Sequence, residues 1–178
     1  MKVSHWETFE WELGSLQTTD RPKLPPFIFR QATPTDRETV EKVLRSVLSQ
    51  EPALSNAQDS PIPPIEEACE IAFLTSECAC MVVQHGSRII GASALNVSHD
   101  APNHLLTGPS ILHEYRSRGI GSALLFSSLD FLKDAGLSLA AGCAREKSVA
   151  ARFVYPKFGG KVAAAVLKER GVPSAVVV

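Results

Sequence analysis

Two glycines and two arginines lie close together just before an apolar segment. Residues 116–122 read RSRGIGS, and the apolar run of residues 123–132 follows directly. Glycine lets the backbone approach a ligand closely, and a helix N-terminus presents unpaired N–H groups with a partial positive charge. These residues therefore predict an anion-binding turn at the start of a helix.

Two common phosphate-binding motifs do not fit this turn. A Walker P-loop requires Lys and then Ser or Thr directly after its last glycine, whereas Gly121 is followed by Ser122 and Ala123. A dinucleotide-binding fingerprint requires a third glycine at position 124, which is Leu124. Neither motif explains the glycine pair.

Length, composition and charge limit the class of protein. The 178 residues are 44% apolar, enough for one domain with a sizeable core, and the formal net charge is −1. This charge gives no general attraction to nucleic acid or to anionic lipid, so we expect neither as a partner. The first residues lack the apolar core of a signal peptide, and no apolar run is long enough to span a bilayer. We expect a cytoplasmic protein.

The cysteine spacing does not indicate a metal site. Cys69, Cys78, Cys80 and Cys143 form no paired CxxC pattern. We expect reduced, mostly buried thiols and no metal.

The first half of the chain contains the elements that would support the turn. Residues 5–13 alternate as a half-buried strand with Phe9, Trp11 and Leu13 on one side. A linker follows, then a strand at 27–31 and a helix that we expect to begin with a capping box of Thr35 and Glu38.

The remaining elements suggest a mixed fold. We expect a loop at 50–64, a helix from residue 65, an antiparallel hairpin around His85 and Gly86, and a strand at 105–112 broken near Pro109. A helix from Gly119 to Gly136, a strand at 137–144 and a short helix closed by Pro156 follow, then strands at 161–167 and 174–178. The fold class is α+β (mixed α/β), with a mainly antiparallel central sheet flanked by helices.

The glycine segment resembles the acetyl-CoA motif of the GNAT N-acetyltransferase superfamily, Arg/Gln-x-x-Gly-x-Gly/Ala. Arg116, Gly119 and Gly121 match that motif, and Ile111 is the aliphatic residue five positions before the arginine. The resemblance implies a GNAT fold and acetyl-CoA as cosubstrate, with the pyrophosphate held by the loop and the pantetheine arm held near residues 111–113. The implied cofactor-binding residues are Ile111, Leu112, His113, Arg116, Ser117, Arg118, Gly119, Ile120, Gly121, Ser122 and Ser148.

A second segment resembles the family pattern Asn-x-x-Ala-x-x-hydrophobic-Tyr-x-Lys-x-Gly-Phe. Residues 148–160 read SVAARFVYPKFGG, and the match implies that Tyr155 is the general acid that protonates the departing CoA thiolate. The sequence differs at two positions, since Ser148 stands where the pattern has Asn and Gly160 where it has Phe. The resemblance covers about residues 27–165, so we divide the chain into an N-terminal extension, 1–26, and a GNAT domain, 27–178.

The resulting hypothesis is an acetyl-CoA-dependent N-acyltransferase that acetylates an amine of a small molecule or of a protein by direct attack. His104, Glu114 and Glu146 are candidates for a general base, and none of them is preferred over an ordinary structural role. The acceptor would lie near residues 51–64 with Glu66, Glu67 and Glu70, although these carboxylates also fit a solvated face. The alternative is a catalytically inactive acyl-CoA sensor or partner-binding subunit.

Trp6 and Trp11 fit packing in an added strand better than a homodimer contact.

Overall fold

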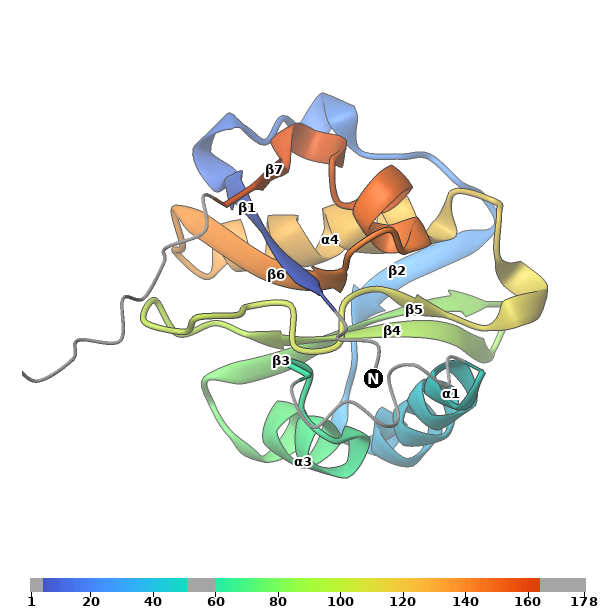
Figure 1. The fold of residues 1–178 in the computed structure, drawn as a ribbon. Helices are drawn as coiled ribbons and strands as arrows, with labels where there is room; N and C mark the ends of the chain where they lie inside the picture. The colour runs from blue at the N-terminus through green and yellow to red at the C-terminus, as the bar shows by residue number, and fades with distance from the viewer. Residues whose placement is uncertain (1–4, 51–59, 164–178) are drawn as a thin grey trace, which may run out of the picture.

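Two sheets and their helices make up the described part of the chain. The computed structural model describes residues 5–50 and 60–163. Within these ranges one sheet has the strand order β2-β3-β4-β5 and the other has β6-β1-β7 (Figure 1). The α+β fold with mainly antiparallel strands is confirmed. The strands are β1 (Trp6–Glu12), β2 (Phe27–Gln31), β3 (Cys78–His85), β4 (Arg88–Asn96), β5 (Ser110–Ile111), β6 (Leu139–Arg145) and β7 (Lys161–Val162).

The first sheet is centred on the predicted β3/β4 hairpin. The two strands pair antiparallel from Cys78 with Asn96 to His85 with Arg88, and Gly86 in the turn has φ 61°. Glycine tolerates this left-handed conformation, which closes the two-residue turn.

The helices enclose this sheet. Helices α1 (Arg37–Ser49) and α3 (Ile65–Leu74) lie together on one side of it, and α4 (Ile120–Asp134) lies on the other (Figure 1). On the apolar faces of α1 and α3 most side chains are buried, while Leu48, Ile65 and Phe73 are partly exposed. The buried ones are Val40, Val43, Leu44, Val47, Ala68, Cys69 and Ala72.

The expected capping box was wrong by two residues, because it closes a 3-10 turn (Pro34–Asp36) that leads directly into α1. The capping box is formed by Thr33 and Asp36, whose carboxylate accepts the Thr33 backbone N–H at 2.8 Å. Pro34 occupies the first turn, where a missing N–H costs nothing, and Arg30 donates to the same carboxylate at 2.7 Å. This guanidinium explains why Asp36 caps the turn in place of Glu38, because Arg30 holds the Asp36 side chain at the helix start.

Helix α4 begins and ends as predicted. Gly119 is its N-cap with φ 78°, and Gly136 follows its C-terminus with φ 97°. The buried face includes Leu124, Leu125 and Leu129. The turn of residues 116–122 is therefore fixed to a long helix that is anchored in the core.

Strand β1 lies inside the second sheet, between β6 and β7. It pairs antiparallel with β6 over seven residues, from Trp6 with Arg145 to Glu12 with Leu139. It also pairs with β7 at Phe9 and Glu10. The predicted inward face is confirmed, since Phe9, Trp11 and Leu13 are all buried. The N-terminal segment is thus a structural part of the fold, while the domain boundary near residue 26 stays a prediction.

The linker after β1 packs along α4. Leu16 is buried, and its carbonyl oxygen accepts a hydrogen bond from Lys133 Nζ at 2.9 Å. Arg21 forms an ion pair with Asp130 and lies over the ring of Phe126. These contacts fasten the segment that carries β1 to the outer side of the helix.

Three expectations in the second half need correction. The strand expected at 105–112 is limited to Ser110–Ile111, because Gly108 with φ 64° and Pro109 interrupt the ladder. The helix expected before Pro156 is a π-helix of five residues, Ala150–Val154. The strand expected at 161–167 is seen at Lys161–Val162, and its last four residues and the strand expected at 174–178 lie outside the described residues.

The four cysteines carry free thiols, and Cys69 and Cys80 are buried. Burial raises the pKa of the Cys69 thiol to about 11 and that of Cys80 to about 12. No helix among the described residues is long and apolar enough to cross a membrane.

Candidate active site

The two sheets meet at one point and separate beyond it. Leu105 bridges Leu95 on β4 and Gly142 on β6, and the second bridge is parallel. A Cβ atom at Gly142 would lie only 2.7 Å from the Leu105 side chain, so the close approach requires glycine. After Leu105, the segment that leads into β5 pairs only with β4, in the first sheet. Strand β6 pairs with β1, in the second sheet. Two parallel segments therefore separate next to the turn that starts α4.

The turn has the geometry of an anion site. Ser117 and Gly119 both adopt left-handed backbone conformations, with φ values of 62° and 78°. Gly119 accepts the first helical bond, from the Ala123 N–H at 3.1 Å. The N–H groups of Ile120, Gly121 and Ser122 precede that bond and have no partner within the helix. They can serve a phosphate, whose charge also interacts favourably with the helix dipole.

The two arginines of the turn have different roles. Arg116 is half-buried, and its Nε donates to the carbonyl oxygen of Ile111 at 3.2 Å, which fixes the turn to β5. The Arg118 guanidinium is exposed, lies 5.6 Å from the Tyr115 ring centroid and donates to the Glu114 carbonyl at 3.3 Å. Arg118 is therefore the arginine that can turn toward a ligand from solvent.

The predicted pantetheine segment lies at the edge of the first sheet. Ile111 and Leu112 are buried, and the Leu112 N–H donates to the Ile90 carbonyl at 2.9 Å. His113 is exposed in the following 3-10 turn, His113–Tyr115.

Lys157 is a cation beside the turn that the sequence analysis did not assign to cofactor binding. Its Nζ donates to Ser122 Oγ at 3.0 Å, across 35 residues of sequence. A local pattern does not reveal this contact, because it depends on how the chain returns to α4 after β6.

Tyr155 is in the core. Its side chain is 2% exposed, and its ring meets Phe9 and Trp11 edge-on at centroid distances of 5.5 and 5.3 Å. Its hydroxyl group lies directly against Gly108, so a Cβ atom there would overlap it. Burial, with a smaller effect of the Cys143 thiol, raises the pKa of Tyr155 above its usual value. The phenol therefore stays protonated, as a general acid must before it acts.

Trp11 and Gly160 hold the segment that follows Tyr155. The Trp11 indole N–H donates to the Lys157 carbonyl at 3.0 Å. A Cβ atom at Gly160 would overlap the Tyr155 carbonyl oxygen and come within 2.6 Å of Trp11 Nε1. A side chain at position 160, where the family pattern has Phe, is thus excluded first by the Tyr155 carbonyl oxygen and then by the Trp11 indole on β1.

Ser148 has a local partner. Its Oγ accepts the Ala151 backbone N–H at 3.1 Å and caps the π-helix. The hydroxyl hydrogen can still be donated, so the predicted cofactor contact stays a prediction.

The three base candidates differ in availability. His104 Nδ1 accepts the Ala141 N–H at 2.9 Å, which leaves the proton on Nε2, 3.1 Å from the Ser98 carbonyl. Burial lowers the pKa of His104, and both ring nitrogens are engaged, so this histidine ties the two sheets together. Glu114 pairs with Arg88 at 3.0 Å, whereas the side chain of Glu146 is exposed.

The expected acceptor region is described only in part. Residues 51–59 lie outside the described residues. On α3, Glu66 pairs with Arg45 at 2.6 Å, and the same guanidinium also pairs with Glu41 at 2.8 Å.

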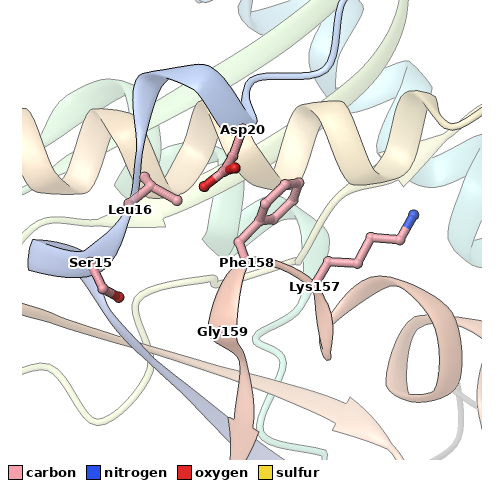
Figure 2. A pocket seen from close by; sticks show the side chains of 6 residues that line it. All are labelled: Ser15, Leu16, Asp20, Lys157, Phe158 and Gly159. Atoms are coloured by element: carbon pink, nitrogen blue, oxygen red, sulfur yellow. The ribbon is translucent and has the colours of Figure 1, made fainter.

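A pocket of about 480 Å³ lies beside the turn of Lys157, Phe158 and Gly159, which is part of the second segment, 148–160, that resembles the family pattern. Figure 2 shows Phe158 directed toward α4 and Lys157 extended along it, with Leu16 and Asp20 on the opposite wall. The Phe158 ring meets Phe126 edge-on at 5.2 Å, which anchors the turn to the helix.

A family comparison identifies the class of protein. The model of the acetyltransferase (GNAT) family matches residues 43–160, about two thirds of the chain. The chain therefore belongs to the GNAT acetyltransferase family. A search of curated proteins finds no match.

Solved structures share the fold at low sequence identity. A GCN5-related N-acetyltransferase from Sphaerobacter thermophilus superposes with a TM-score of 0.60 at 15% identity, covering 92% of this chain and 50% of that one. One from Kribbella flavida gives 0.55 at 16% identity, covering 90% and 55%. A conserved protein of unknown function from Staphylococcus epidermidis gives 0.60 at 13%, covering 89% and 57%. The chain spans about half the length of these structures.

Proposed function

We propose that this chain transfers the acetyl group of acetyl-CoA to an amine of a small molecule or of a protein. The observation that supports this most is the glycine-capped start of α4 beside the separating sheets. A helix N-terminus with three unpaired N–H groups suits a pyrophosphate. The separation of β5 from β6 leaves backbone groups that are not shared between the two sheets, and such groups suit an extended cosubstrate.

The residues supply parts of the reaction. The amine nitrogen attacks the thioester carbonyl carbon, the C–S bond breaks, and the departing thiolate takes a proton. Tyr155 is the proposed donor, because it lies in the segment that resembles the family pattern and its hydroxyl group lies against Gly108, just before β5. The proton of the attacking amine leaves to water or to the exposed Glu146 carboxylate, because both ring nitrogens of His104 are engaged and Glu114 is paired with Arg88.

The cofactor site is tested by thermal melting with acetyl-CoA, desulfo-CoA, NAD and ATP, each in large excess. A ligand at about 100 times its dissociation constant adds about 2.7 kcal/mol, which for this size corresponds to a rise of several degrees in Tm. Both CoA compounds should raise the Tm and NAD should not. A larger shift with NAD or ATP than with the CoA compounds would contradict the proposal.

A second function is favoured by one observation. Tyr155 is 2% exposed and enclosed by aromatic rings, as a purely structural residue would be. The alternative is a CoA-binding protein without turnover, acting as a sensor or partner subunit. Tyr155→Phe separates the two functions: in an enzyme it lowers kcat while the CoA affinity stays unchanged. A sensor shows the same melting shifts and releases no CoA from acetyl-CoA with any amine.

A further inference from the structure

We propose that Trp11, on strand β1, is a positioning residue that fixes Tyr155 for proton transfer. This inference rests on the proposed acetyltransferase function. It assigns a role in catalysis to the N-terminal strand, which precedes residues 43–160 matched by the family model.

Two contacts from Trp11 converge on the segment that carries Tyr155. The indole N–H donates to the Lys157 carbonyl, two residues beyond the tyrosine, at 3.0 Å. The indole ring meets the phenol ring at 5.3 Å and 78°, an edge-on arrangement. Trp11 therefore restrains both the ring and the backbone that follows it.

The far end of the tyrosine is restrained as well. The hydroxyl group lies against Gly108, next to the start of β5 and the point where the two sheets separate. A small tilt of the ring about its Cα atom moves the oxygen most, because the oxygen is the atom farthest from the backbone. Proton transfer requires the donor within about 2.6–3.2 Å of its acceptor, so such a tilt lowers the rate of that step.

The space around Gly160 shows that the contact is specific. A Cβ atom at this position would meet both the Tyr155 carbonyl oxygen and Trp11 Nε1. The indole therefore packs closely against Gly160, in the volume beside the Tyr155 backbone. A smaller side chain at position 11 would leave this volume empty and the turn less constrained.

Strand β1 also offers a matched control. Trp6 lies on the same strand, five residues earlier, so its side chain points to the opposite face of the sheet. It is partly exposed, and its Nε1 has no hydrogen-bond partner among the described residues. Trp6→Phe thus removes an indole N–H from β1 without touching Tyr155.

The test compares Trp11→Phe, Trp6→Phe, Tyr155→Phe and the double variant Trp11→Phe/Tyr155→Phe in the full chain. Release of CoA from acetyl-CoA is followed with an amine panel and with water as acceptor. Trp11→Phe should lower kcat about fivefold, as expected for loss of one hydrogen bond, and leave KM for acetyl-CoA unchanged. Trp6→Phe should keep the original kcat.

The double variant shows whether Trp11 positions the Tyr155 phenol or only stabilises the fold. If Trp11 acts through the phenol, Trp11→Phe has no further effect on kcat once Tyr155 is Phe. An equal fall in kcat in both backgrounds overturns the inference and leaves the acetyltransferase function standing.

Other results would contradict the proposed function and not only the role of Trp11. If Tyr155→Phe keeps the full kcat, the acid role of Tyr155 is wrong and Trp11 has nothing to position. If the original chain releases no CoA with any acceptor, the enzyme hypothesis and this inference are both overturned.

Discussion

The two sheets are assembled from different parts of the sequence. In the first sheet β2, β3, β4 and β5 follow one another in chain order, and β3 and β4 are joined by a two-residue turn. In the second, Trp6 pairs with Arg145, and Phe9 pairs with Val162. Only the β3/β4 pairing of the first sheet is local, because Phe27 on β2 pairs with His85 on β3 across a long stretch of chain. In the second sheet both pairings of β1 join distant segments. The candidate site lies where the two sheets separate, so it needs both.

This difference has an energetic meaning. Closing a long loop costs more conformational entropy than closing a two-residue turn, and it must be offset by burial. In the second sheet that burial comes from Phe9, Trp11 and Leu13, which are at most 3% exposed. Removing β1 should therefore destabilise the second sheet more than it destabilises the first sheet.

The largest expected effect comes from deleting residues 1–13. Truncating a buried Phe or Trp costs about 3–5 kcal/mol, so losing both removes most of a typical stability of about 5–15 kcal/mol. Strand β6 also loses its antiparallel partner. Hydrogen exchange should show that the β6 amides lose protection, while the amides of the β3/β4 hairpin stay more protected than those of β6. Unchanged protection in β6 would show that β1 is dispensable.

A glycine comparison should give an intermediate effect. Gly160→Ala places a Cβ atom onto the Tyr155 carbonyl oxygen and the Trp11 indole, and overpacking of this kind costs about 1–3 kcal/mol. Gly14→Ala is the matched control, since no atom lies within 4 Å of its Cβ position. Urea denaturation measures both free energies of unfolding. Equal values for the two variants would mean that the turn after Tyr155 can move away from both the Tyr155 carbonyl oxygen and the Trp11 indole at little cost.

The smallest effect is expected in the local contacts of the first sheet. Arg30 lowers the pKa of Asp36 from 3.8 to about 2. Because the folded-state pKa lies below the unfolded value, this stabilisation is present above pH 3.8 and is lost as the pH falls toward 2. Asp36→Asn should lower the free energy of unfolding at pH 7 by about 1–2 kcal/mol, a value discounted because the Arg30 side chain is 35% exposed.

The pH dependence supplies the check on that variant. Urea denaturation from pH 7 to pH 2 should show the difference between Asp36→Asn and the original chain shrinking with acid. Glu38→Gln, in an exposed pair with Lys42, should change little at any pH. A constant difference down to pH 2 would exclude the charge of Asp36 as the cause.

The sequence predicted elements that local patterns specify. The β3/β4 hairpin, α1, α3 and α4 follow from apolar spacing and from glycines such as Gly119 and Gly136, whose positive φ values mark the ends of α4. The capping box before α1 was misplaced because two Thr-x-x-acid patterns overlap there. The Asp36 carboxylate is held by Arg30, which lies outside both patterns.

Within the candidate site, the turn of residues 116–122 could be predicted from the sequence, but the residues around that turn could not. Arg116, Gly119 and Gly121 lie close together in the sequence, so their pattern predicted an anion site. The contacts of Lys157 with Ser122 and of Trp11 with Tyr155 join segments far apart in the chain. No local periodicity specifies such pairs. The strand character of β1 was visible from its alternation, but its position between β6 and β7 was not.

The position of β1 also sets a sequence of events during synthesis. Residues 6–12 leave the ribosome well before residues 139–145 and 161–162, which are their only strand partners among the described residues. Domains generally fold during synthesis as their segments emerge, so the β3/β4 hairpin can form while β1 still has an unpaired, aromatic-rich edge. The newly made chain therefore carries β1 with unpaired edges until residues 139–145, and then residues 161–162, have been made.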